Sequence, residues 1–213
     1  MRVKIVIVGV GGQGILFLTR LLSEAARALG HEVIGTETHG MSQRGGSVIS
    51  HLKVNCGAAP LVRRGTADVL LALDPDEAYR ALGFLRNGGV AFVNTGRPDF
   101  PSPEIAARLS ERNITVYTLN ADAVASELGS PALANVVLLG FASGHPGFPW
   151  PHEAIVGAVK RVGKVTLRRA NERALAQGYA AFSPTAGLLR QESPRSPTPS
   201  RHPPARGDTS RGA

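Results

Sequence analysis

A short glycine-rich segment carries more hydrogen-bonding side chains than a surface turn needs. Residues 39–47 read His-Gly-Met-Ser-Gln-Arg-Gly-Gly-Ser. The glycines permit left-handed backbone conformations and a close approach to a ligand. Ser42, Gln43 and Arg44 supply donors at successive positions, and a planar guanidinium suits a phosphate or a carboxylate. The segment therefore predicts a ligand-binding loop, with a solvated glycine-rich turn as the alternative.

A second glycine-rich turn lies near the start of the chain. Residues 2–8 form an apolar, β-branched run, typical of a buried parallel strand, and lead into Gly-Val-Gly-Gly-Gln-Gly at residues 9–14. This G-x-G-x-x-G pattern stands directly between a strand and the helical stretch 15–29. Such a turn leaves N–H groups free at a helix N-terminus, where an anion can bind. Tight strand-to-helix packing without a ligand is the alternative.

The two glycine-rich segments are expected to meet. Residues 32–37 read as the second strand, and the polar segment begins directly after it at Thr38. Open α/β sheets bind ligands at the carboxyl ends of their strands. We therefore expect the two turns to lie side by side at that edge of the sheet.

A dinucleotide is one ligand that these residues allow. Glu37 closes the second strand, and an acidic residue roughly 20 residues after such a turn holds the ribose hydroxyls in dinucleotide-binding folds. A stand-alone NAD- or FAD-binding or regulatory module is therefore one interpretation of the chain.

Strand-like and helix-like patterns alternate along the chain, which predicts an α/β fold. We expect a single Rossmann-like domain with a doubly wound, mostly parallel sheet and helices on both faces. The expected strands are residues 3–8, 32–37, 48–54, 69–73, 90–94 and 114–119. The expected helices are residues 15–29, 76–85, 103–112 and an apolar stretch from 121, broken by Gly129 and Pro131. Residues 144–151 are expected to form a stiff loop that either contacts a partner or packs its aromatic side chains on the core.

Composition separates a folded body from a tail. With 213 residues and 43% hydrophobic content the chain can bury a substantial core, and we expect one domain over residues 1–182. Residues 183–213 are rich in Pro, Ser and Arg and are expected to be disordered. Five arginines, one glutamate and one aspartate give this tail +3 of the total charge of +8. Charge is thus spread over tail and body, and no nucleic-acid partner is expected.

Several other chemistries lack the residues that they need. Cys56 is the single cysteine, which excludes an internal disulfide and an iron–sulfur cluster. Metal-binding spacings are absent from the sequence. Ser42 and His39 have no third group to complete a triad, so no catalytic residue is expected in this chain. Neither a membrane span nor a signal peptide is found, and we expect a cytoplasmic protein without membrane contact.

Taken together, residues 9–14 and 37–48 resemble the gamma-type subunit or domain of the 2-oxoacid:ferredoxin (acceptor) oxidoreductases. His-Gly-Met-Ser-Gln before Arg-Gly-Gly is typical of the indolepyruvate branch, and most similar to its beta subunits. Pyruvate and 2-oxoglutarate members usually carry a Tyr-Gly-Pro-Glu type of sequence there. The resemblance continues through residues 67–95, 131–140 with Asn135, and 171–179, and so covers about residues 1–182.

This resemblance implies an oxidoreductase that converts an aryl 2-oxoacid such as indolepyruvate and coenzyme A to acyl-CoA and carbon dioxide, with reduction of ferredoxin. The reaction needs an electron sink and single-electron carriers, and this chain has no Gly-Asp-Gly motif and no cysteine set. Thiamine diphosphate, magnesium and [4Fe-4S] clusters are therefore expected in a larger alpha-type partner. No cofactor is expected to be held by this chain alone.

Coenzyme A is the ligand that the resemblance implies for the two glycine-rich segments. The gamma-type domain is associated with coenzyme A binding in related enzymes, and this role is carried over to Gly11, Gly12, Gln13, Ser42, Gln43 and Arg44. The full set of expected binding residues adds Gly9, Gly14, His39, Gly45 and Gly46.

Overall fold

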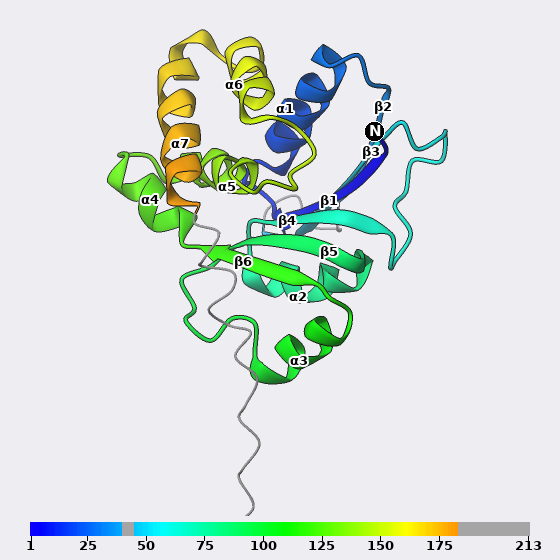
Figure 1. Cartoon of the computed structure of the whole chain (residues 1–213). Helices are drawn as coiled ribbons and strands as arrows, with labels where there is room; N and C mark the ends of the chain where they lie inside the picture. The colour runs from blue at the N-terminus through cyan, green and yellow to red at the C-terminus, as the bar shows by residue number, and fades with distance from the viewer. Residues whose placement is uncertain (40–44, 183–213) are drawn as a thin grey trace, which may run out of the picture.

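A six-stranded sheet lies between two layers of helices (Figure 1). The computed structural model describes residues 1–39 and 45–182, and the strand order is β2-β3-β1-β4-β5-β6. The strands are β1 (Val3–Val10), β2 (Val33–His39), β3 (Ser47–Val54), β4 (Ala67–Ala72), β5 (Leu85–Asn94) and β6 (Thr115–Leu119). Strands β1, β4, β5 and β6 are parallel, whereas β3 is antiparallel to both β1 and β2. The predicted α/β class with a mostly parallel sheet is confirmed.

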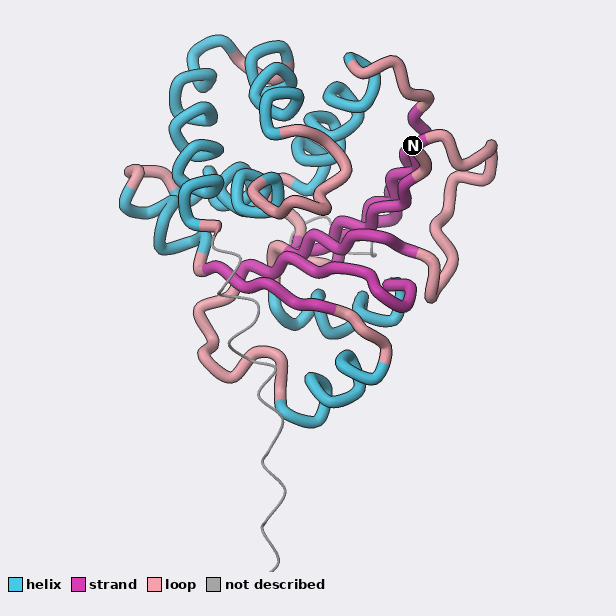
Figure 2. The backbone as a smooth tube through the Cα atoms, viewed as in Figure 1, coloured by secondary structure: helices cyan, strands magenta, loops and turns pink. Residues whose placement is uncertain are grey.

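Helices cover both faces of this sheet (Figure 2). One face packs against α1 (Ile15–Ala28), α4 (Ala121–Glu127), α5 (Ala134–Ser143), α6 (His152–Arg161) and α7 (Arg168–Ala181). The other face packs against α2 (Pro75–Ala81) and α3 (Pro103–Glu111). Three short 3-10 helices, η1 (Leu82–Phe84), η2 (Pro131–Leu133) and η3 (Val165–Leu167), connect these elements.

Strand β1 shows why the chain folds into these layers. Successive side chains of a strand point to opposite faces of the sheet. Ile5 and Ile7 accordingly pack with the α1 layer, while Val6 and Val8 pack with the α2 layer. A strand covered on both faces reads as a continuous apolar run, which is the pattern at the start of this chain.

Helices α5 and α7 approach one another through glycine. A Cβ atom on Gly140 would lie 2.1 Å from the Leu175 carbonyl oxygen, and one on Gly178 would lie 1.9 Å from the Val137 carbonyl oxygen. No side chain fits at either contact, so the two helix backbones pack directly against each other. Both helices help to frame the site described below.

Four elements differ from the sequence-based expectations. Strand β2 ends at His39 and so includes Thr38, where the loop was expected to begin. The expected helix over residues 76–85 ends at Ala81, and a turn of 3-10 helix leads into β5. Strand β5 begins at Leu85 rather than at Val90 and includes the glycine pair Gly88 and Gly89. Helix α6 was not expected at all.

The loop over residues 144–151 packs its aromatic side chains on the core. Phe148 is 8% exposed and Trp150 is 2% exposed, and their rings meet edge to face with centroids 5.9 Å apart. The packing alternative therefore holds for this loop. The tail over residues 183–213, expected to be disordered, lies outside the described residues.

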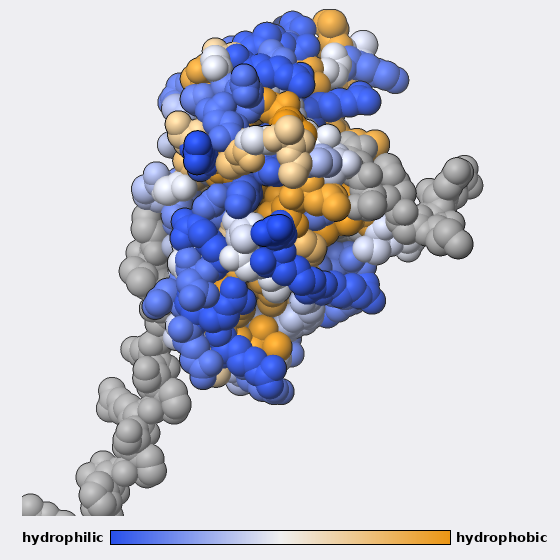
Figure 3. All heavy atoms as spheres, turned by 90° about the vertical axis from the view of Figure 1, so that its right-hand side faces the viewer, coloured by the Kyte–Doolittle hydropathy of each residue, from blue (hydrophilic) through white to orange (hydrophobic). Residues whose placement is uncertain are grey.

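The surface seen from the right-hand side of Figure 1 is mostly hydrophilic, and the apolar side chains that reach it gather toward the middle (Figure 3). In the described ranges, no helix is long and apolar enough to cross a membrane.

Candidate functional site

A cleft of about 610 Å³ opens at the carboxyl edge of the sheet. Its walls are the glycine turn after β1, the ends of β4 and β5, and the first turns of α1, α4, α5 and α7. The lining residues used below are Gly12, Gly14, Leu73, Asn94, Asp122, Asn135, Lys164 and Asn171. This edge is where open α/β sheets bind ligands.

The turn between β1 and α1 requires glycine for two reasons. Gly12 and Gly14 have positive φ angles of 103° and 82°, which other residues rarely adopt. A Cβ on Gly14 would also lie 2.1 Å from Asn135 Nδ2, and one on Gly9 would lie 2.5 Å from Gln13 Oε1. By contrast, the space beside Gly12 is open to 4 Å. Gly9 and Gly14 thus permit packing, while Gly12 presents bare backbone to the cleft.

Gln13, expected to contact a ligand, is used by the protein itself. Its Oε1 accepts from the Val10 N–H at 2.7 Å, and its Nε2 donates to the Leu73 carbonyl at 3.2 Å. Its own N–H donates to the Val10 carbonyl at 3.1 Å. Gln13 therefore holds the turn against the end of β4. Within the described part, the turn N–H groups without a partner are those of Gly12 and Gly14, and the N–H groups of residues 15–17 in the first turn of α1 have none either.

Asn135 holds the same turn from a distant part of the chain. Its Nδ2 donates to the Gln13 carbonyl at 3.2 Å across 122 residues of sequence, and its Oδ1 accepts from the Val136 N–H at 2.7 Å. The side chain is buried. The sequence marked Asn135 only as part of a later helix, because nothing local to it reveals this contact.

Asn94 joins three elements at the back of the cleft. Its Nδ2 donates to the Leu73 carbonyl at 3.1 Å and to Asp122 Oδ2 at 2.9 Å, while its Oδ1 accepts from the Ala121 N–H at 2.8 Å. Sequence reasoning did not single out this residue. The available signal was a polar side chain at the end of the apolar run over residues 90–93.

The second glycine-rich segment meets the turn at its C-terminal end. The Gly46 carbonyl accepts from the Gly11 N–H at 2.9 Å, and the next residue, Ser47, donates from its Oγ to Glu77 Oε2 at 2.6 Å. Gly45 has a positive φ of 78°. The expected approach of the two segments is thus confirmed for Gly46. Ser42, Gln43 and Arg44 lie outside the described residues, and His39 is described only as the backbone partner of Val48.

The reason for this approach differs from the expected one. Strand β3 lies between β1 and β2, and its first residue pairs with Val10. The segment therefore reaches the turn through β3, whereas β2 lies two strand spacings, roughly 10 Å, from β1. Glu37 on β2 is thus not on the strand next to the turn, where a dinucleotide site places its acidic residue.

Helix N-termini and two charged side chains set the electrostatics of the cleft. Helices α1, α5 and α7 begin at it without a side-chain cap among the residues described, and helix N-termini carry partial positive charge. The charged residues that line it are Lys164 and Asp122. Burial lowers the pKa of His51, His145 and His152, but none of these three lines the cleft. Such an arrangement suits an anion, and none of the histidines whose side chains the structure describes lines the cleft.

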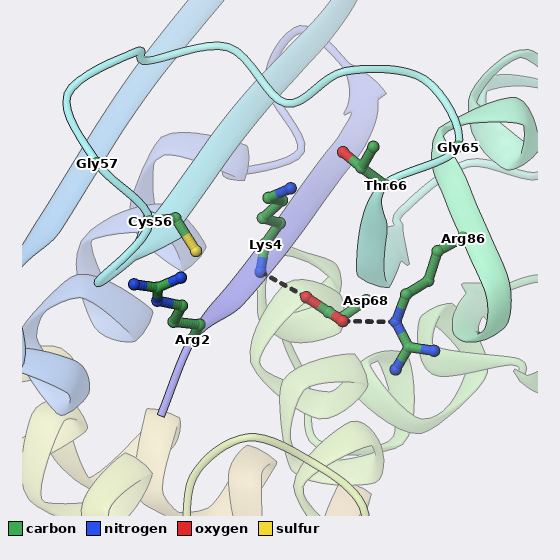
Figure 4. Close-up of a pocket in the computed structure, with 8 residues that line it drawn as sticks. All are labelled: Arg2, Lys4, Cys56, Gly57, Gly65, Thr66, Asp68 and Arg86. Carbon is green, nitrogen blue, oxygen red and sulfur yellow. Dashed lines mark hydrogen bonds and ion pairs between the residues drawn. The ribbon is translucent and has the colours of Figure 1, made fainter.

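A metal site is not found in the described ranges, where no three His, Cys, Asp or Glu side chains come together. The opposite edge of the sheet carries a larger hollow, of about 690 Å³, which we call the amino-edge groove (Figure 4). There Asp68 accepts from the Lys4 N–H at 2.8 Å and from Arg86 Nε at 2.6 Å. Asp68 and Arg86 are partly exposed to solvent, so their charges satisfy each other at the surface.

Comparison with known proteins identifies the family. Residues 4–181 match the family model described as pyruvate ferredoxin/flavodoxin oxidoreductase. The chain belongs to this family. Within the pyruvate ferredoxin/flavodoxin oxidoreductase family it is of the gamma type, a subunit of a 2-oxoacid:ferredoxin oxidoreductase and so part of a multi-subunit complex.

Curated relatives match almost over their full lengths. The indolepyruvate oxidoreductase subunit IorB of Archaeoglobus fulgidus is 38% identical over 190 residues, which cover 84% of this chain and 94% of the relative. The subunit of the same name from Methanothermobacter thermautotrophicus is 33% identical over 85% of this chain and 98% of its own length.

Solved structures share the fold. The gamma subunit of a keto/oxoacid ferredoxin oxidoreductase from Geobacter sulfurreducens aligns with a TM-score of 0.65 and 24% identity, over 84% of this chain and 96% of that one. A 2-oxoglutarate:ferredoxin oxidoreductase from Magnetococcus marinus, solved with 2-oxoglutarate, coenzyme A and succinyl-CoA, aligns with a TM-score of 0.66 and 20% identity. The aligned part is 84% of this chain and 30% of that longer chain.

Proposed function

We propose that this chain is the smaller subunit of an indolepyruvate:ferredoxin oxidoreductase, and that its carboxyl-edge cleft binds the phosphate-bearing part of coenzyme A. The substrate assignment is supported by the relatives named above, which match nearly end to end and are indolepyruvate oxidoreductase subunits. The His-Gly-Met-Ser-Gln sequence before Arg-Gly-Gly, at residues 39–46, favours the same branch.

The observation that carries the binding assignment is the pair of unpartnered N–H groups on Gly12 and Gly14 at the start of α1. Backbone donors at a helix N-terminus form a ready site for a phosphate. The volume of about 610 Å³ lies within the usual range of ligand pockets. The Magnetococcus marinus enzyme, whose fold this chain shares, was solved with coenzyme A.

The contribution that we propose for this chain is to bind and orient coenzyme A, with Ser42, Gln43 and Arg44 of the glycine-rich loop as further candidate contacts. The redox centres belong elsewhere, because Cys56 is the single cysteine of the sequence. We place thiamine diphosphate, magnesium and [4Fe-4S] clusters in a larger alpha-type partner. Thiamine diphosphate supplies the electron sink there, and ferredoxin accepts the electrons.

Purification of the complex through this chain tests the proposal. A thiamine diphosphate-containing partner should be recovered, and the complex should reduce ferredoxin with indolepyruvate faster than with pyruvate or 2-oxoglutarate. Reduction should require coenzyme A. Recovery of the chain without such a partner, or a complex that is inactive with indolepyruvate, would contradict the assignment.

A titration of the full chain with NAD and FAD tests the alternative that the chain is a stand-alone dinucleotide-binding or regulatory module. Because β3 separates Glu37 from the glycine turn, we expect no binding at micromolar concentration. Micromolar affinity for either dinucleotide would favour the stand-alone module instead.

A further inference from the structure

Asn171 differs from the other buried asparagines of the cleft. Asn94, Asn135 and Asn171 are 2%, 6% and 6% exposed. The side-chain amides of the first two form hydrogen bonds within the protein. Asn94 bonds to the end of β4 and to α4, and Asn135 bonds to the glycine turn. Within the part of the chain that the structure describes, the amide of Asn171 has no hydrogen-bond partner. It is therefore the buried amide that the protein itself leaves unused.

The unused amide reaches the cleft. Among the described residues, the single buried side-chain nitrogen or oxygen that lacks both a partner and surface access is Trp150 Nε1. The amide of Asn171 must therefore retain access, and Asn171 lines the cleft. The cleft is lined as well by the apolar residues Phe17, Leu167 and Ala170 and by Lys164.

The fold gives no reason of its own for an asparagine here. Asn171 lies in the first turn and a half of α7, past the capping position at which asparagine stabilises a helix. Asparagine is a poor residue inside a helix, and a buried amide without a partner costs free energy. A ligand that supplies the missing partner offsets both costs.

We propose that Asn171 is a specificity-determining residue of the cleft, and that it hydrogen-bonds an amide or nucleobase edge of a ligand whose phosphates lie at Gly12 and Gly14. The carboxamide of asparagine carries an N–H donor beside a carbonyl acceptor. It can therefore pair with another amide or with a nucleobase edge, which also carries a donor beside an acceptor. The inference rests on the proposed function, since coenzyme A carries such edges both in its adenine and in its pantetheine amides.

Calorimetric titration of the purified complex tests this role with N171L, which removes the amide and keeps a similar volume. Coenzyme A should bind about two- to tenfold more weakly, as expected for one neutral hydrogen bond, while inorganic pyrophosphate should bind as in the wild type. Q177L on the same helix is the matched control, because Gln177 is exposed and does not line the cleft. It should change neither affinity.

Two fragments of coenzyme A distinguish the sources of the hydrogen bond. Adenosine 3′,5′-bisphosphate should lose affinity in N171L if adenine is the contacted group, and phosphopantetheine should do so if a pantetheine amide is. Either result supports the proposal.

Stability separates a ligand contact from a structural role. N171L should melt at the wild-type temperature or above, because it removes a buried amide that has no hydrogen-bond partner among the described residues. If N171L does not assemble, N171D tests the same point, since it removes the donor and should weaken coenzyme A binding. A variant that binds coenzyme A as tightly as the wild type overturns the inference about Asn171 and leaves the proposed function standing. The same holds for a variant whose affinities for coenzyme A and for pyrophosphate fall equally. A wild-type complex that binds no coenzyme A overturns the inference and the proposed function together.

Discussion

The two edges of the sheet carry hollows of similar size but opposite character. The cleft at the carboxyl edge measures about 610 Å³ and the amino-edge groove about 690 Å³. In the cleft, the unpartnered groups are backbone N–H groups and one buried amide. In the groove, Asp68 pairs with Arg86 and with the Lys4 backbone (Figure 4). The difference teaches that chain direction, and not the size of a hollow, decides where helix N-termini and their free N–H groups gather.

The largest effect should come from the helix pair that frames the cleft. G178A would place a Cβ 1.9 Å from the Val137 carbonyl oxygen. To relieve this clash, α5 and α7 would have to separate and so disrupt the packing of their helix layer. We expect a loss of about 3 kcal/mol in the free energy of unfolding, measured by urea denaturation of the full chain. The control is G157A on α6, where the nearest atom to a Cβ is the flexible Arg161 side chain at 3.2 Å. A G178A variant no less stable than G157A would contradict this packing.

The glycine turn should show the next largest effect. G14A combines an unfavourable φ with a contact of 2.1 Å to Asn135 Nδ2, so we expect about 2 kcal/mol of destabilisation and at least tenfold weaker coenzyme A binding. In an N135A background the added cost of G14A should shrink, because the contacted amide is gone. Equal costs in both backgrounds, measured by a double-mutant cycle, would show that Asn135 does not restrain the turn.

Much of this edge could be predicted from the sequence, and the reasons are local. The glycine turn follows from a strand, a G-x-G-x-x-G pattern and a helix, all within residues 3–28. The direction of β3 was also within reach: seven residues separate His39 from Ser47, and a parallel connection needs a dozen or more. The start of β5 was hidden because Gly88 and Gly89 resemble a loop while lying inside the strand.

The asparagines of the cleft could not be predicted, because their roles depend on contacts across the chain. Asn135 meets the turn across 122 residues, and Asn94 meets Asp122 across 28. Asn171 is distinguished by being buried at the cleft without a partner among the described residues, which only the packed molecule shows. Local patterns specify the backbone donors of the site, whereas tertiary packing selects the side chains around them.

Acidification should lower stability through residues that lie away from the cleft. Burial lowers the pKa of His51, His145 and His152 in the folded chain, so the unfolded chain binds protons more readily. Their contribution is complete above the ordinary histidine pKa of about 6.5 and is lost as the pH falls below it, at up to about 1.4 kcal/mol per pH unit for each histidine. Urea denaturation between pH 7.5 and pH 5 checks this. H51Q should reduce the slope, and an unchanged slope would mean that His51 does not contribute.

The smallest effects are expected in the amino-edge groove. R86Q removes the ion pair with Asp68, in which the Arg86 side chain is 49% exposed. Exposed pairs contribute about 0–1 kcal/mol, so thermal unfolding should shift by only a few degrees at most. Coenzyme A should bind R86Q as it binds the wild type, since the groove lies at the opposite edge. A marked loss of affinity for coenzyme A would assign the binding role to the amino-edge groove and not to the cleft at the carboxyl edge.

Hydrogen–deuterium exchange of the purified complex, with and without coenzyme A, tests the central claim most directly. If coenzyme A binds at the carboxyl edge, exchange should slow at the glycine turn and the start of α1 and at the first turns of α5 and α7. Residues 2–4 and 84–88, at the amino edge, should exchange as before. Protection confined to the amino edge, or to neither edge of this chain, would contradict the account.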